Sequence, residues 1–161
     1  MKILVFGYGN PGRQDDGLGP LLVSRLEQEG FPHVTFDSDY QLNIEDAATL
    51  ADYDAVIFID ATVEDVPPFS FTELHPALKI TFTTHSISAE SLVALTTELF
   101  DKRVKSYMLA IPGYEWEVMN ETISEGAKEN ADKAYSFMMQ LLSNPTEETF
   151  NHALDGLSLQ S

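Results

Sequence analysis

Two aspartates and one histidine end or follow predicted strands of this chain. Asp16 lies in the glycine-rich loop after the first strand, Asp60 ends an apolar strand, and His85 follows a later one. The carboxyl ends of parallel strands meet at one edge of an open sheet, so we expect these three side chains to converge there. Two carboxylates and an imidazole suit a borderline divalent cation such as zinc or nickel, and they leave coordination positions open for water or substrate.

Each of these residues also has an ordinary structural interpretation. Either acid of the Asp15-Asp16 pair could cap the helix that follows. Asp60 could form a turn, and His85 could be a buried imidazole bonded to the backbone. Taken singly, these interpretations are the commoner ones, because caps and turns outnumber active-site acids. Taken together at one edge of one sheet, the three residues favour a functional site.

Strand and helix patterns alternate along the chain that must position these residues. Apolar runs predict strands, and apolar residues spaced three or four apart predict helices. The expected strands are 2–6, 34–37, 55–60, 69–74 (at a sheet edge, or in an excursion that shields the site), 80–84 and 104–111, and the expected helices are 18–29, 43–51, 89–100 and 122–142. This alternation predicts an α/β sandwich with a largely parallel sheet. We expect one domain over 1–143, then a tail at 144–161 that is a loosely attached helix or frays.

The composition restricts both the partners and the chemistry. A net charge of −17 disfavours nucleic acids and anionic membranes, which bind proteins through basic patches. The absence of cysteine excludes disulfides, thiolate metal sites and a cysteine nucleophile, so a metal site must use oxygen and imidazole ligands. His33, His75 and His152 are weaker candidates than His85, because they lie at a strand entry, in a loop and on the tail. The chain has neither Gly-x-Ser-x-Gly nor His-Glu-x-x-His, which disfavours a serine hydrolase and a helical zinc protease.

The apolar content points to a folded, soluble protein. It amounts to 43% of the residues, with 11% aromatic, which is ordinary for a globular domain. No apolar run approaches the length of about 18 residues that a membrane span needs. The apolar run within 1–7 is too short for a signal peptide. We therefore expect a cytoplasmic protein.

The glycine-rich loop also allows a nucleotide-binding alternative. Gly7-x-Gly9-x-x-Gly12 follows a strand, and Asp37 ends the next strand, where a dinucleotide site places its ribose ligand. The predicted helix, however, begins more than a turn after the last glycine, so its amides would miss the pyrophosphate. The Asp15-Asp16 pair also brings negative charge to the place of the phosphates. This alternative is therefore the weaker one.

Five short motifs resemble those of the nickel–iron hydrogenase maturation proteases. They occur in the expected order and at suitable spacing, and the resemblance extends over about 1–142. They are Gly7-x-Gly9-Asn10 after the first strand, Asp15-Asp16-Gly17-x-Gly19, Ile59-Asp60-Ala61, Thr84-His85-x-x-Ser88 and Pro112-Gly113-Tyr114.

The resemblance implies a fold, an activity and a ligand set. The fold is a three-layer α/β/α sandwich around a twisted five-stranded sheet, mostly parallel with one antiparallel strand. The activity is that of an aspartyl-type endopeptidase that removes the C-terminal extension of the hydrogenase large-subunit precursor after nickel insertion. A cation is implied at Asp16, Asp60 and His85. Family members often carry glutamate at the first position, so Asp16 shortens that ligand by one methylene.

The resemblance leaves the mechanism open. The nickel is expected to come with the precursor, and zinc or cadmium could occupy the site in vitro. A cation there could polarise the scissile carbonyl or a water molecule, or Asp16 or Asp60 could act as a general base. We expect a monomer, because the site must admit a folded large subunit. A non-catalytic, metal-binding assembly factor would need the same ligands and remains the alternative from another functional class.

Overall fold

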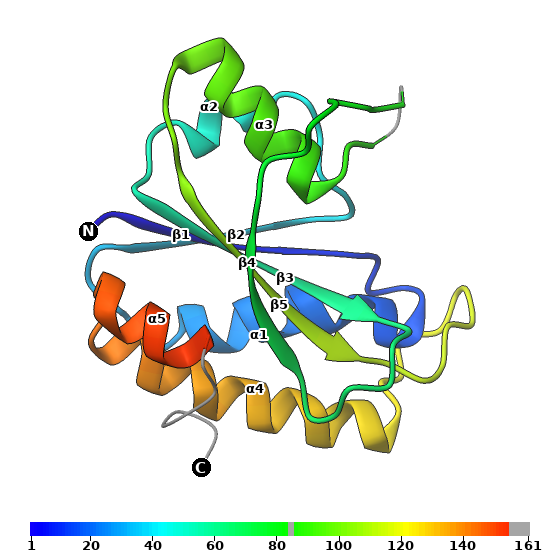
Figure 1. The fold of residues 1–161 in the computed structure, drawn as a ribbon. Helices are drawn as coiled ribbons and strands as arrows, with labels where there is room; N and C mark the ends of the chain where they lie inside the picture. The colour runs from blue at the N-terminus through cyan, green and yellow to red at the C-terminus, as the bar shows by residue number, and fades with distance from the viewer. Residues whose placement is uncertain (84–85, 155–161) are drawn as a thin grey trace.

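The computed structural model describes residues 1–83 and 86–154, which form one five-stranded sheet covered by helices on both faces (Figure 1). The strand order is β2-β1-β3-β5-β4, and only β4 runs antiparallel to its neighbour. The predicted fold class is confirmed. The strands are β1 (Ile3–Tyr8), β2 (Val34–Asp39), β3 (Ala55–Thr62), β4 (Ser70–Leu74) and β5 (Lys105–Pro112); the helices are α1 (Leu18–Glu27), α2 (Asp46–Leu50), α3 (Ala89–Phe100), α4 (Glu125–Ser143) and α5 (Glu147–Leu154), and η1 (Gln14–Gly17) is a 3₁₀ turn.

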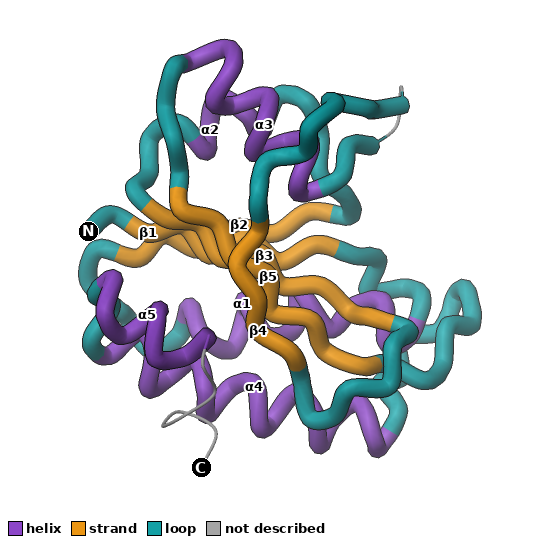
Figure 2. The backbone as a smooth tube through the Cα atoms, viewed as in Figure 1, coloured by secondary structure: helices purple, strands orange, loops and turns teal. Residues whose placement is uncertain are grey.

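Both faces of the sheet are buried, which explains why the central strands are continuously apolar. In β1, Ile3 and Val5 pack in the core shared with α1, α4 and α5, whereas Leu4 and Phe6 pack in the core shared with α2 and α3. Figure 2 shows these helix layers on opposite sides of the strands. Alternate residues of a strand face opposite layers, so the side of the sheet on which a residue of β1 or β3 lies follows from its position.

The strand order creates a crevice at one edge of the sheet. The chain passes from β1 to β2 on one side and continues to β3 on the other side of β1. Helices after β1 and after β2 therefore lie on different faces, and the chain connections that leave the carboxyl ends of β1 and β3 diverge at this switch point. Open α/β sheets bind their ligands in this place.

The predicted strand at 80–84 is wrong for its described residues. Within the described part of the chain, this segment contributes an isolated bridge between Phe82 and Ile87. The fifth strand is instead β4, the segment predicted at a sheet edge, and it occupies the place beside β5. Phe82 is 56% exposed, so the strand-like alternation of Ile80-Thr81-Phe82 does not bury this aromatic side chain.

The tail is better attached than the sequence suggests. Phe150 of α5 is fully buried, and its ring meets the ring of Tyr107 edge-on, with 5.0 Å between the centroids. Ala153, one turn later, is buried in the same core. The expectation of a loose helix or a frayed tail is therefore corrected for α5, which completes the core below β4 and β5. The remainder of the predicted tail, 155–161, lies outside the described residues.

In 1–83 and 86–154, no helix combines the length and the apolar character that crossing a membrane requires.

Candidate functional site

A cavity of about 350 Å³ lies at the switch point between β1 and β3. Asp16 and Asp60 both line it, as the sequence predicts for the ends of these two strands. Tyr8, at the end of β1, also lines the cavity, as do residues 86–90, which lead into and begin α3. The sheet therefore brings together two of the three predicted site residues.

Asp16 is held by the glycine-rich loop itself. One carboxylate oxygen of Asp16, Oδ2, accepts a hydrogen bond of 2.8 Å from the backbone amide of Asn10. Gly9 has a φ of +141°, and a Cβ atom there would lie 1.9 Å from the carbonyl oxygen of Asp16. Only glycine permits this backbone and this approach. The loop glycines thus fold the chain around a carboxylate.

A second glycine brings this loop against β3. A Cβ atom on Gly19, in the first turn of α1, would lie 2.5 Å from the carbonyl oxygen of Ile59 and 2.8 Å from that of Tyr8. The start of α1 therefore touches the carboxyl ends of both strands directly. Because Asp16 precedes this turn and Asp60 follows Ile59, the close packing places the two acids at the same cavity.

Tyr8 is a site residue that sequence reasoning missed. Gly7 pairs with Ile59 in the parallel register, so Tyr8 comes beside Asp60 on the face that carries Phe58. The ring of Tyr8 meets that of Phe58 edge-on at 6.3 Å, and its hydroxyl group donates a hydrogen bond to Asp60. The sequence did contain a signal for this contact. Tyr8 follows Phe6 by two residues and Asp60 follows Phe58 by two, so Tyr8 and Asp60 lie on the same face of the sheet as these two phenylalanines.

The carboxyl group of Asp60 is electrostatically unsatisfied. Burial raises its pKa to about 7, and the negative charge of Asp16 adds to the effect, despite hydrogen bonds from the Ala61 amide and the Tyr8 hydroxyl. Burial, Asp60 and Glu90 likewise raise the pKa of Tyr8. Strongly shifted groups in a cleft are typical of functional sites. A bound cation would favour the ionised form of Asp60.

The lining of the cavity suits a cation and not a phosphate. Among the described residues that line it, Asp16, Asp60 and Glu90 are acidic, and none is lysine or arginine. The amide of Asn10, which a phosphate would need, is already bonded to Asp16. α1 begins at Leu18, well after the glycine motif, so its amino end is not available to a pyrophosphate there either. These features disfavour the nucleotide-binding alternative.

Asp15 does not belong to this cavity, and neither acid of the Asp15-Asp16 pair caps α1. The residue at the N-cap is Gly17, without a side-chain hydrogen bond. The buried carboxylate of Asp15 points to the loop before α4 and accepts hydrogen bonds from the amides of Tyr114, Glu115 and Ser124 and from the hydroxyl of Ser124. Burial by itself would raise the pKa of Asp15, but these hydrogen bonds outweigh it and lower the pKa below its ordinary value.

The third predicted ligand, His85, lies outside the described residues. The residues directly after it, 86–90, line the cavity, and Ser88 caps α3 by accepting a hydrogen bond of 3.1 Å from the Ser91 amide. Within 1–83 and 86–154, no three histidine or acidic side chains are grouped closely enough to hold a metal ion. The role of His85 as a ligand therefore stays a prediction.

Comparison with known proteins gives a likeness in fold. No protein-family model and no curated protein matches the chain by sequence. Among solved structures, the [NiFe] hydrogenase maturation protease HycI of Thermococcus kodakarensis KOD1 matches with a TM-score of 0.70 and 22% identity, over 89% of this chain and 93% of that one. The hydrogenase maturating endopeptidase HybD of E. coli matches with a TM-score of 0.71 and 17% identity, over the same shares of the two chains.

A third structure extends this likeness to another source. The hydrogenase 2 maturation peptidase from a Thaumarchaeota archaeon matches with a TM-score of 0.65 and 22% identity, over 89% of this chain and 99% of that one. The chain has the maturation-protease fold. It spans nearly the whole length of these structures, and 89% of its own residues are covered by the likeness.

Proposed function

We propose that this protein is an endopeptidase that removes the C-terminal extension from the large-subunit precursor of a nickel–iron hydrogenase after nickel insertion. The observation that carries the proposal is the acidic cavity at the switch point, in a chain with the maturation-protease fold. The sequence motifs that resemble this family supply the same two aspartates. The proposed partner is the nickel-loaded precursor, which a monomer of this protein would process in the cytoplasm.

Nickel enters this proposal as part of the substrate. Asp16 and Asp60 would bind it through carboxylate oxygens, with His85 as the third ligand, and zinc or cadmium could take its place in vitro. The Oδ2 atom of Asp16 is bonded to the Asn10 amide, while Oδ1 has no hydrogen-bond partner among the described residues. Oδ1 is therefore the atom that Asp16 can offer to a cation.

The residues around Asp60 orient its carboxylate toward the cavity. The Tyr8 hydroxyl and the Ala61 amide both donate hydrogen bonds to it. A cation between Asp16 and Asp60 would supply Lewis-acid polarisation of a carbonyl group or of water. The protein itself would hold Asp16 and Asp60 in fixed positions near the ends of β1 and β3, and its open cleft would admit an extended peptide.

The test is a processing assay with the cognate precursor, with and without nickel loaded, read out as intact mass. The wild-type protein should release a C-terminal peptide only from the nickel-loaded precursor. Asp60→Asn should slow this release by at least about a hundredfold, the scale of losing one charged group at a reaction centre. Asp65→Asn, the same chemical change on an exposed loop, is the matched control and should process at the wild-type rate.

Two results would contradict the proposal. One is the absence of cleavage with a verified, nickel-loaded cognate precursor, which would favour the assembly-factor alternative if the precursor still binds. The other is full processing by Asp60→Asn, which would show that the switch-point cavity is not the reaction site.

A further inference from the structure

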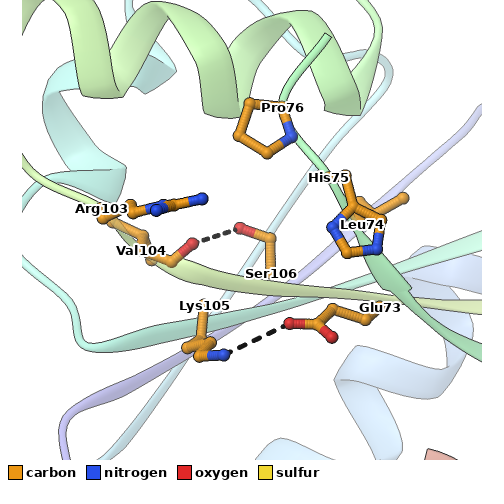
Figure 3. Close-up of a pocket in the computed structure, with 8 residues that line it drawn as sticks. All are labelled: Glu73, Leu74, His75, Pro76, Arg103, Val104, Lys105 and Ser106. Atoms are coloured by element: carbon orange, nitrogen blue, oxygen red, sulfur yellow. Dashed lines mark hydrogen bonds and ion pairs between the residues drawn. The ribbon is translucent and has the colours of Figure 1, made fainter.

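A second cavity, of about 270 Å³, lies where the chains of β4 and β5 separate (Figure 3). The two strands are paired up to Leu74 and Ser106, and beyond this pair the chain after β4 diverges from the chain before β5. Asp60 is paired with Ala110, four residues further along β5. Each residue of a β-strand advances about 3.3 Å. Measured along β5, the second cavity therefore lies roughly 13 Å from the residue that pairs with Asp60, toward the other end of the strands.

The charge at this edge is opposite to the charge of the molecule. The chain has 26 acidic residues and only 9 lysines and arginines, yet three of those nine, Lys102, Arg103 and Lys105, fall within four positions. Two of them, Arg103 and Lys105, line the cavity together with His75. The single acid in the lining is Glu73, and its carboxylate is already paired with the Lys105 ammonium group at 3.4 Å.

Arg103 carries an uncompensated charge. Among the hydrogen bonds and ion pairs of the described residues, none involves its guanidinium group, whereas Arg25 pairs with Asp132 at 2.9 Å and Arg13 donates to the Trp116 carbonyl at 3.0 Å. Figure 3 shows that Arg103 and His75 come from the two diverging chain segments and that the guanidinium group of Arg103 extends into the space between them. Within the described residues, His75 likewise makes no hydrogen bond or ion pair. Both side chains therefore have donors to offer to a ligand.

The backbone beside these donors is arranged so that it does not repel an anion. The buried hydroxyl of Ser106 donates a hydrogen bond of 2.9 Å to the carbonyl oxygen of Val104. This bond occupies an acceptor in the wall of the cavity and fixes the segment from which Arg103 projects. The cavity thus presents two cationic side chains from one chain segment and an imidazole from the other, while the Val104 carbonyl group and the Glu73 carboxylate are both engaged.

We propose that this cavity, the β4–β5 fork, is an oxyanion-binding site that takes a carboxylate or phosphate group. Arg103 provides the planar fork of donors that suits either group, His75 donates from the opposite wall, and Lys105 contributes charge at the rim. In a chain of net charge −17, an anionic ligand is repelled by most of the surface, so this edge is where it can approach. The inference is independent of the proposed peptidase function.

The test is an NMR titration of the isotope-labelled full chain with inorganic phosphate and, separately, with succinate, against sodium chloride at equal ionic strength. The expected result is a saturable shift of the backbone signals of 73–76 and 103–106 with at least one of the two oxyanions. Tighter binding of phosphate would identify a phosphate group as the ligand chemistry, and tighter binding of succinate would identify a carboxylate.

Charge-matched variants separate a site from a general charge effect. Arg103→Gln should weaken binding at least about tenfold, as expected for the loss of charge-assisted hydrogen bonds. Lys133→Gln removes the same charge from an exposed position on α4 and should leave the affinity within about twofold. Both residues are exposed, so neither change should affect folding. Shifts that do not saturate, that chloride reproduces, or that Arg103→Gln and Lys133→Gln alter equally would overturn the proposal.

Discussion

Two neighbouring aspartates, Asp15 and Asp16, show opposite ways of accommodating a carboxylate. Asp15 is completely buried, but three backbone amides and one hydroxyl group donate to it, and its pKa lies below the ordinary value. Asp16 receives one amide on one oxygen and faces Asp60, whose pKa rises to about 7. The first arrangement stabilises the fold, whereas the second leaves charge that a ligand must neutralise. Burial alone therefore does not distinguish a structural acid from a functional one; the number of donors does.

The largest expected effect on stability comes from removing the carboxylate of Asp15, which accepts four hydrogen bonds. Asp15→Ala should lower the free energy of unfolding by about 3–5 kcal/mol, because it leaves buried donors of the Tyr114–Ser124 loop without an acceptor. Chemical denaturation at neutral pH measures this loss. Since the pKa of Asp15 is lowered by folding, its ionised form stabilises the protein above the ordinary aspartate pKa, and this contribution is lost as the pH falls further. An unchanged midpoint would show that these hydrogen bonds do not stabilise the fold.

Removing the charge of Asp60 should change the free energy of unfolding in the opposite direction. Asp60→Asn should raise the free energy of unfolding of the metal-free protein at pH 8, by on the order of 2 kcal/mol, because a carboxylate that folding makes harder to ionise is replaced by a neutral amide. The folded state of the wild type binds more protons than the unfolded state between about pH 4 and 7, so wild-type stability falls as the pH rises through this window. Thermal melts of both proteins at pH 4 and pH 8 measure the difference. A gain that is equal at both pH values would contradict this origin.

The smallest expected effect concerns the group that holds Asp60. Tyr8→Phe removes one hydroxyl and should lower the free energy of unfolding by about 1 kcal/mol or less, because the ring still packs on Phe58. The hydrogen bond from Tyr8 favours the ionised form of Asp60, so its loss should raise the pKa of Asp60 further. NMR titration of the Asp60 carboxyl carbon measures this shift directly. A shift to lower pH would show that Tyr8 does not donate to Asp60 in solution.

The sequence was sufficient to predict the fold class and the convergence of Asp16 and Asp60 on one cavity. The apolar run before Asp60 marks a strand buried on both faces, and the polar loop before Leu18 marks the turn that carries Asp16. Both signals are local. The fifth strand was predicted less well, because 80–84 alternates between apolar and polar residues as β4 does, and periodicity alone cannot distinguish the two segments.

The errors concern residues whose partners are distant along the chain. Tyr8 meets Asp60 only through the register of β1 and β3, and Asp15 meets donors about a hundred positions away. The position of Asp15 next to a helix start suggested a capping role, but its side chain instead accepts hydrogen bonds from the loop before α4. The attachment of α5 was missed for the same reason, because it depends on the contact of Phe150 with Tyr107.

The hydrogen bonds from Ser124 to Asp15 have a consequence for biosynthesis. They join residues that are 109 positions apart, so the loop that contains Asp16 cannot reach its final form until most of the chain has left the ribosome. A nascent chain that ends with β5, at Pro112, would contain β1, β3 and all the loop glycines, yet would lack the residues that donate to Asp15. Contacts of such long range form late and make folding slow. The final form of the loop that carries Asp16 therefore depends on synthesis of the chain at least as far as Ser124.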